Sequence, residues 1–185
     1  MKIQLTNIQT YGFLTFIGAC MAIIIFMGSA QAQPSIDEWR LGLMAHDAEE
    51  NDEEGVDINA EALIKLDIDS ESLLIPRPLI GVSINTEGDT SQIYGGAAWN
   101  IDIGDDFFSE IMLGVVAHDG ETSKTARTDD RELGCSVMFR EAFSFGYRMD
   151  ESRSVMATIS HISNAGLCDE NSGLTNAGLR YSIRY

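Results

Sequence analysis

The segment 160–166 has the sequence Ser-His-Ile-Ser-Asn-Ala-Gly and gathers residue types that can act together in catalysis. Side chains two positions apart on a β-strand project from the same face, so His161 and Ser163 are neighbours if this segment is extended. A serine hydroxyl attacks an ester when an adjacent imidazole accepts its proton, and a third group usually fixes the tautomer of that imidazole. The spacing therefore predicts a nucleophile and a general base for ester hydrolysis, a chemistry that needs no metal and no cofactor.

Alternation of apolar residues with small or polar ones dominates the chain after residue 33, and this period of two predicts β-strands. Segments of roughly ten residues have the length of a tilted strand that crosses a bilayer. Eight segments show the pattern: 38–46, 56–66, 78–85, 92–103, 107–118, 133–147, 154–163 and 176–185. The expected fold is all-β, an eight-stranded antiparallel transmembrane β-barrel of the outer-membrane type.

A soluble β-sandwich or a lipocalin-like barrel that binds a lipid inside would show the same alternation, with its apolar residues turned inward. No stretch after residue 33 approaches the length of a spanning helix, so in lipid only a closed barrel satisfies every backbone group. The last strand alternates apolar with polar residues and ends on Tyr185, as in outer-membrane proteins, whose barrels carry aromatic girdles at the membrane interfaces. These features favour the membrane barrel.

The N-terminal segment has the order expected of a secretory signal: Lys2, an apolar run over 13–27, and small residues that end in Ala30-Gln31-Ala32. We expect a signal peptide over 1–32 and a barrel domain over 33–185. Because the apolar run is close to the length that spans a bilayer, a retained membrane anchor is the alternative.

The formal net charge of −17 comes from acidic residues that cluster in 47–54, 67–71 and 129–132, between the apolar segments. Such clusters are typical of solvated loops. The charge argues against nucleic-acid binding, which requires a basic surface to neutralise phosphates. A membrane remains the expected environment.

Connection lengths give the orientation of the strands, since barrels of this class have short periplasmic turns and longer outer loops. The connections after the fourth and sixth segments are short, whereas those after the first, fifth and seventh are long. The seventh segment then runs outward, which brings His161 and Ser163 towards the outer leaflet. Both share the parity of Val155, Ala157 and Ile159, so we expect them to face lipid. An ordinary His and Ser at the membrane rim, bonded to water or headgroups, is the alternative interpretation.

The run 161–165, followed by Asn-Ser-Gly at 171–173 and a strand ending in an aromatic residue, resembles the PagL-type lipid A 3-O-deacylases of the outer membrane. The clear match covers 155–185, and the opening strand over 39–47 is similar to relatives of that group. The resemblance implies an eight-stranded barrel in a Gram-negative outer membrane, with its active site on the outer wall. The implied substrate is lipid A of the surrounding lipopolysaccharide.

By motif position, the resemblance implies that His161 is the general base, that Ser163 is the nucleophile and that Asn164 helps to hold the oxyanion. The third member in the family is a glutamate early in the last strand, a position that falls at Thr175 here. The group that orients the imidazole therefore stays open among four residues: Thr175, Asn176, Asp169 and Glu170. If none of them does so, the protein has lost activity. The alternative function is a non-enzymatic surface barrel that binds through its acidic loops. The sequence also leaves open whether the chain forms a homodimer.

Cys135 and Cys168 remain outside the signal segment, and a hairpin that turns near residue 150 would bring both to the outer end of the barrel. Because the route to the cell surface is oxidising, we expect a disulfide between them, with two free thiols as the alternative. His46 and His118 each precede an aspartate at the outward end of a strand and are interpreted as rim residues. Glu141 interrupts the apolar side of the sixth segment without an evident reason.

Overall fold

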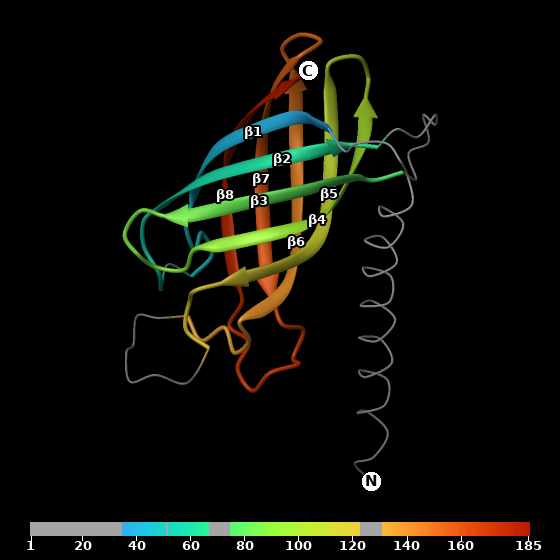
Figure 1. Cartoon of the computed structure of the whole chain (residues 1–185). Coiled ribbons are helices and arrows are strands. Elements are labelled where there is room, and N and C mark those ends of the chain that lie inside the picture. Colours follow the sequence, from blue (N-terminus) through green and yellow to red (C-terminus); the bar gives the residue numbers. More distant parts are fainter. Residues whose placement is uncertain (1–34, 51, 67–74, 123–130) are drawn as a thin grey trace. The chain divides into compact units, whose positions relative to one another are not determined.

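Eight antiparallel strands form a closed barrel in the computed structural model, which describes residues 35–50, 52–66, 75–122 and 131–185 (Figure 1). The strands are β1 (Ser35–Ala45), β2 (Val56–Lys65), β3 (Arg77–Asn85), β4 (Gln92–Ile103), β5 (Phe107–His118), β6 (Val137–Arg148), β7 (Arg153–Ser163) and β8 (Leu174–Arg184). Each strand pairs with its neighbours in the sequence, and pairing of β1 with β8 closes the barrel. The expected all-β eight-stranded barrel is confirmed, while the signal-peptide prediction for 1–32 lies outside the described residues.

The outer wall of the barrel is apolar, because alternate residues of each strand leave their side chains uncovered. Leu41, Leu43 and Leu179 are each more than 60 % exposed, although each lies in the middle of a strand. A water-soluble protein rarely exposes an apolar surface of this extent, whereas a hydrocarbon environment favours it. The alternation in the sequence therefore points its apolar side outward, as a membrane barrel requires. No helix in the described parts of the chain is long and apolar enough to cross a membrane.

The lumen is filled by side chains, and its polar part centres on Arg40. This guanidinium donates two hydrogen bonds of 2.7 Å to the carboxylate of Glu110 and one of 2.6 Å to Glu38. All three side chains are about 98–99 % buried. Buried charges of this kind must be paired, because the interior offers no water to solvate them.

Strand ends differ from the sequence prediction where loops add constraints. The sixth strand begins at Val137 and not at residue 133, because Gly134 has a left-handed φ of 79° that a strand cannot accommodate. Leu133 instead donates a backbone hydrogen bond to Glu121 in the loop after β5. The eighth strand begins two residues earlier than predicted, at Leu174, which adds Thr175 to the sheet.

The two ends of the barrel differ in their connections. The turns at 104–106 and 149–152 lie at the end that also holds the start of β1 and the end of β8. The described parts of the connections after β1, β3, β5 and β7 lie at the opposite end, which we call the loop end (Figure 1): 46–50, 52–55, 86–91, 119–122, 131–136 and 164–173. Since Ser163 is the last residue of β7, the sequence motif lies at the loop end.

Candidate active site

His161 and Ser163 lie on the outer face of β7, next to each other along the strand. Residues 154, 156, 158, 160 and 162 of β7 are buried in the lumen, whereas the alternate positions are open to the outside. His161 and Ser163 belong to the second set and are half-buried, since the loops of the loop end partly cover them. The structure thus places both side chains on the exterior of the barrel, two positions apart on one strand.

Thr175 is the hydrogen-bond partner of His161. The two residues are directly opposite each other in the pairing of β7 with β8, and the imidazole Nδ1 lies 2.9 Å from the Thr175 Oγ1. That hydroxyl in turn donates to the Glu49 Oε2 at 3.0 Å. A hydroxyl has one proton, so with its proton directed to Glu49 it accepts from Nδ1–H. This polarity leaves Nε2 of His161 unprotonated and able to act as a base.

The other residues considered as the third member have different contacts. Asn176 faces the lumen, where its amide donates to the Asp57 Oδ2 at 2.7 Å. Asp169 is exposed in the loop after β7. The backbone carbonyl of Glu170 accepts a hydrogen bond from the Asn164 side chain. Among the described residues, only Thr175 forms a hydrogen bond with the His161 side chain.

Asn164 does not have the position that the resemblance implied. Its side chain is 1 % exposed, because it lies one residue beyond the end of β7 and is covered by the segment before β6 and the loop after β7. Its amide donates to the backbone carbonyls of Leu133, at 2.9 Å, and Glu170, and its Oδ1 accepts from the backbone N–H groups of Gly166 and Leu167. The structure therefore leaves this side chain no free hydrogen-bonding group for an oxyanion, since its amide binds the segment before β6 and the loop after β7.

Glu141, unexplained in the sequence, lies directly opposite His161 on the other side of β7, in the pairing of β6 with β7. Its side chain is exposed on the outer wall. It makes no hydrogen bond with the imidazole. An ionisable group on a lipid-facing wall is costly and marks a candidate functional position, and its register opposite His161 places Glu141 in the surroundings of the site.

Arg131 connects the loop before β6 with the two loops that surround His161. Its guanidinium donates to the backbone carbonyls of Ser172 and Gly173, at 2.9 and 3.0 Å. It also donates to the carboxylates of Glu50, at 2.6 Å, and Asp52, at 3.0 Å. The side chain is only 4 % exposed although it lies among loops. Arg131 thereby fixes the loop after β1 relative to the loop after β7.

Cys135 and Cys168 form a disulfide, with their Cα atoms 5.9 Å apart. The bond joins the segment before β6 to the loop after β7. The loop after β7 then enters β8 through Gly173, which has a left-handed φ of 68°. A Cβ at this glycine would lie 2.8 Å from Cε1 of His161, so the backbone packs directly against the imidazole.

His46 is not the rim residue that the sequence suggested, because it is only 4 % exposed and lies inside the loop end, just beyond β1. Its Nδ1 and Nε2 each lie 2.8 Å from a carboxylate oxygen, of Asp57 and Glu53 respectively. Burial alone lowers the pKa of His46, but the hydrogen bonds to these two carboxylates outweigh it and raise the pKa to about 9. His118 is half-buried, and its Nε2 lies 2.6 Å from the Cys135 carbonyl oxygen.

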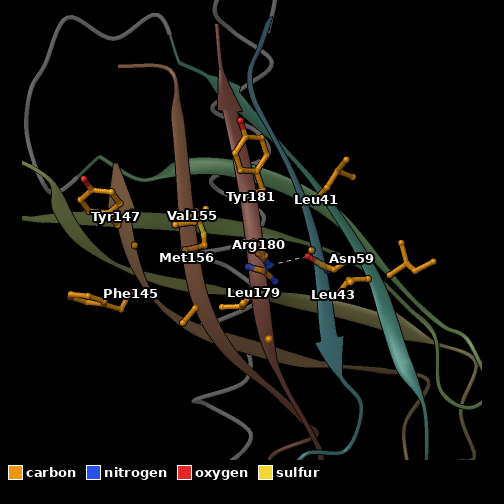
Figure 2. Close-up of a pocket in the computed structure, with 15 residues that line it drawn as sticks. Leu41, Leu43, Asn59, Phe145, Tyr147, Val155, Met156, Leu179, Arg180 and Tyr181 are labelled. Atoms are coloured by element: carbon orange, nitrogen blue, oxygen red, sulfur yellow. Dashed lines mark hydrogen bonds between the residues drawn. The ribbon is translucent and has the colours of Figure 1, made fainter. Parts of the chain in front are cut away.

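An apolar groove runs along the outer wall on the same side of the barrel as His161 and Ser163. Figure 2 shows Leu41, Leu43, Val155, Leu179 and Tyr181 around it, on β1, β7 and β8. Polar residues at the groove turn away from it, as the hydrogen bond of 2.8 Å between Arg180 and Asn59 in the lumen illustrates. The groove does not include His161 or Ser163, since its lining on β7 is residues 155–157, but its apolar surface is suited to hydrocarbon chains.

A family model described as "Lipid A 3-O-deacylase (PagL)" matches residues 79–184, more than half of the 185-residue chain. The chain belongs to the PagL family of lipid A 3-O-deacylases. The Lipid A deacylase PagL of Pseudomonas aeruginosa is 34 % identical over 76 residues, which cover 41 % of this chain and 41 % of that protein. The match thus spans less than half of that relative.

The crystal structure of an outer-membrane PagL enzyme is similar in fold, with a TM-score of 0.62 at 20 % identity, covering 80 % of this chain and 99 % of that chain. The family name describes a deacylase, which is a hydrolase. The crystal structure of PagL and this chain share the barrel fold. Membership of the PagL family and the apolar outer wall place the chain in the outer membrane of a Gram-negative cell.

Proposed function

We propose that this chain is an outer-membrane esterase that removes the 3-O-linked acyl chain from lipid A, with Ser163 as the nucleophile and His161 as the general base. The observation that carries the proposal is the hydrogen bond of 2.9 Å from the His161 Nδ1 to Thr175, on the outer face of the barrel. It leaves Nε2 to accept a proton on the same face as the Ser163 hydroxyl. Membership of the PagL family supports the choice of lipid A as substrate.

The first half of the reaction forms an acyl-enzyme. His161 Nε2 accepts the proton as Ser163 Oγ attacks the ester carbonyl carbon, which gives a tetrahedral intermediate. When this intermediate collapses, the bond to the sugar oxygen breaks, and the imidazolium returns its proton to that oxygen. The products of this half are a free 3-hydroxyl on lipid A and an ester between the acyl chain and Ser163.

The second half consumes one water molecule. His161 accepts a proton from the water as its oxygen attacks the acyl-enzyme, and Ser163 leaves as the free hydroxyl after it regains the proton. The fatty acid is released into the membrane. All of these groups come from one chain, so the proposed reaction does not depend on a homodimer.

Asn171 is proposed as the side chain that holds the oxyanion, in place of Asn164. Its Oδ1 accepts the backbone N–H of Asn164 at 2.8 Å, which holds the carboxamide close to the residue that follows the nucleophile. Its Nδ2 makes no hydrogen bond with another described residue and so keeps two protons for a substrate oxygen. Loss of one such donor typically lowers turnover by about 10²- to 10³-fold.

The level of the site along the barrel fits an ester near the sugar of a glycolipid. Ser163 ends β7, and beyond it the apolar wall gives way to polar loops. An acyl chain bound at Ser163 would run along the apolar wall, while the sugar lies among the loops. Delivery to this membrane is proposed to use residues 1–32 as a cleavable signal peptide, so the mature chain begins at Gln33 by N-terminal sequencing.

The test is the mass of lipid A from Gram-negative cells of defined lipid A structure that express the chain. Wild-type protein removes one hydroxyacyl group, and Ser163→Ala or His161→Ala abolishes the loss. Ser160→Ala is the matched control, because Ser160 lies on the lumen face of the same strand and leaves the reaction intact. An unchanged lipid A mass in cells whose membranes hold folded wild-type barrel would refute the proposal.

A further inference from the structure

We infer that Glu49, in the loop after β1, is a positioning residue that orients His161 through the hydroxyl of Thr175. This inference rests on the proposed function, because it assigns a second role in the same reaction. Glu49 supplies the acidic group that is missing at position 175. It is far from that position in the sequence, since Glu49 and Thr175 are separated by 126 positions. The hydrogen-bond chain runs from His161 Nδ1 to Thr175 Oγ1, at 2.9 Å, and on to Glu49 Oε2, at 3.0 Å.

The direction of these two hydrogen bonds is fixed by the chemistry of their ends. A carboxylate offers only acceptors, so the single proton of the Thr175 hydroxyl points to Glu49. The lone pairs of the hydroxyl are then left to accept from His161, which selects the tautomer with the proton on Nδ1. Without Glu49, the same hydroxyl could donate to an unprotonated Nδ1 and stabilise the tautomer that cannot act as a base at Nε2.

Glu49 also stabilises the charged state of the imidazole during the reaction. When His161 takes the proton of Ser163, the positive charge is shared with Nδ1–H, and the Thr175 hydroxyl is polarised towards it by the carboxylate. No proton has to pass to Glu49 for this effect, because an orienting acid acts by electrostatics and by alignment.

Glu49 is exposed, but the backbone on both sides of it is anchored by hydrogen bonds. The N–H of Ala48 donates to the Thr175 carbonyl at 2.7 Å, and the N–H of Asp47 donates to the Asn176 Oδ1 at 3.2 Å. On the C-terminal side, Asp52 donates its backbone N–H to the Asp47 Oδ2 at 2.8 Å, which closes the loop. Such a preformed loop holds a side chain at a site without a large loss of entropy on each turnover.

Arg131 strengthens this anchoring from the other side of the site. It binds the carboxylates of Glu50 and Asp52 and the carbonyls of Ser172 and Gly173, which flank Glu49 and Thr175 respectively. The loop that carries Glu49 is thereby tied to the loop that enters β8.

Glu141 is the competing carboxylate, because it lies opposite His161 on β6. It makes no hydrogen bond with the imidazole, whereas Glu49 is connected to it through Thr175. The two glutamates therefore predict opposite outcomes: neutralising Glu49 misaligns His161, and neutralising Glu141 leaves its tautomer unchanged.

The experiment compares deacylation rates of purified variants on lipid A in detergent micelles. We expect Glu49→Gln to lower the rate about tenfold and Thr175→Val about a hundredfold, since orienting groups of general bases contribute effects of this order or larger. The double variant is no slower than Thr175→Val, because Glu49 acts only through that hydroxyl. Thr175→Ser, which keeps the hydroxyl, retains most of the activity. Glu54→Gln, an exposed glutamate of the same loop whose side chain makes no hydrogen bond with described residues, is the matched control.

A second measurement, the ¹⁵N NMR spectrum of the His161 imidazole, reads the tautomer independently of activity. Wild type carries the proton on Nδ1, and Glu49→Gln shifts it towards Nε2. Equal rates and spectra for Glu49→Gln and wild type, or effects of Glu49→Gln and Thr175→Val that multiply, would overturn the inference while Ser163→Ala still abolishes turnover. If wild type does not deacylate lipid A, the proposed function falls, and the tautomer change alone decides the role of Glu49.

Discussion

The individual residues of the proposed site divide into those proposed to react and those that hold them in place. His161 and Ser163, the proposed base and nucleophile, lie on the outer face, whereas the side chain of Asn164, one residue further, is bound to the segment before β6 and to the loop after β7. Thr175 belongs to the residues that hold the others, because its hydroxyl is hydrogen-bonded to His161, but it carries no charge of its own. A neutral hydroxyl alone fixes an imidazole weakly, which is why the carboxylate behind it matters.

Replacement of the hydroxyl by a carboxylate tests this view directly. In the Glu49→Gln background, Thr175→Glu places an acid opposite His161 in the sheet, without a second carboxylate to repel it. We expect the deacylation rate to rise about tenfold above that of Glu49→Gln, because a direct carboxylate orients an imidazole better than a hydroxyl does. Rates are measured on lipid A in micelles. A rate no higher than that of Glu49→Gln, in a folded barrel, would contradict the prediction.

Two strands and three loops at the loop end together position the proposed site. β7 and β8 set the His161–Thr175 register, and the three surrounding loops are joined by Arg131 and by the Cys135–Cys168 disulfide. The backbone at Gly173 fills the space beside the imidazole. The position of the base is therefore determined by packing as well as by its hydrogen bond.

Gly173→Ala lowers deacylation more than its effect on folding explains. The added Cβ would lie 2.8 Å from His161 Cε1, so the imidazole must shift. Gly166→Ala is the matched control, since Gly166 also has a left-handed φ, of 75°, but no atom within 4 Å of the added Cβ. Both variants carry a backbone strain of about 1–2 kcal/mol. We expect at least a tenfold lower rate for Gly173→Ala alone, and equal rates for the two would show that the contact has no role.

Stability of the loop end decreases at alkaline pH because of His46. Its pKa is raised to about 9 in the fold, above the ordinary value of 6.5, so its stabilisation is complete below pH 6.5 and is lost as the pH rises through 9. The difference corresponds to about 3 kcal/mol. Urea unfolding in micelles at pH 6.5 and 9.5 measures it, with His46→Asn as the comparison. If the free energy of unfolding of His46→Asn falls as much as that of wild type between pH 6.5 and 9.5, the pH dependence belongs to other groups.

The barrel exposes apolar side chains on its outer wall and buries charged side chains in its lumen, the reverse of a water-soluble protein. Its exterior between the two ends is apolar, and its charges are paired in the lumen around Arg40. Because the lipid provides no hydrophobic driving force between the strands, backbone pairing and the packed interior must maintain the barrel.

Arg40→Met tests the importance of the lumen network. It leaves Glu110 and Glu38 buried without their main partner, which typically costs about 3–5 kcal/mol. The loss appears as a lower urea midpoint of the folded, heat-modifiable form on gels. Arg153→Met is the control, because its ion pair with Asp150 lies on the surface and its removal leaves the midpoint nearly unchanged.

Local patterns in the sequence were enough to predict the architecture and to suggest His161 and Ser163 as the reactive pair. Alternation along eight segments defines which side of each strand meets lipid, and two positions of spacing place His161 and Ser163 on one face. These features are local, because the period of a strand is a property of neighbouring residues. Family membership could be inferred for the same reason, since the motif is contiguous.

The groups that surround His161 depend on contacts between segments far apart in the chain. The sequence offered Asp169 and Glu170 as nearby acids, but the hydrogen-bond chain ends on Glu49, which reaches the site because closure of the barrel pairs β1 with β8. Asn164 lost its assigned role for a related reason: one residue beyond the end of β7, the chain turns, and the side chain is buried by a loop. Contacts between distant segments depend on register and loop packing, which no local pattern encodes.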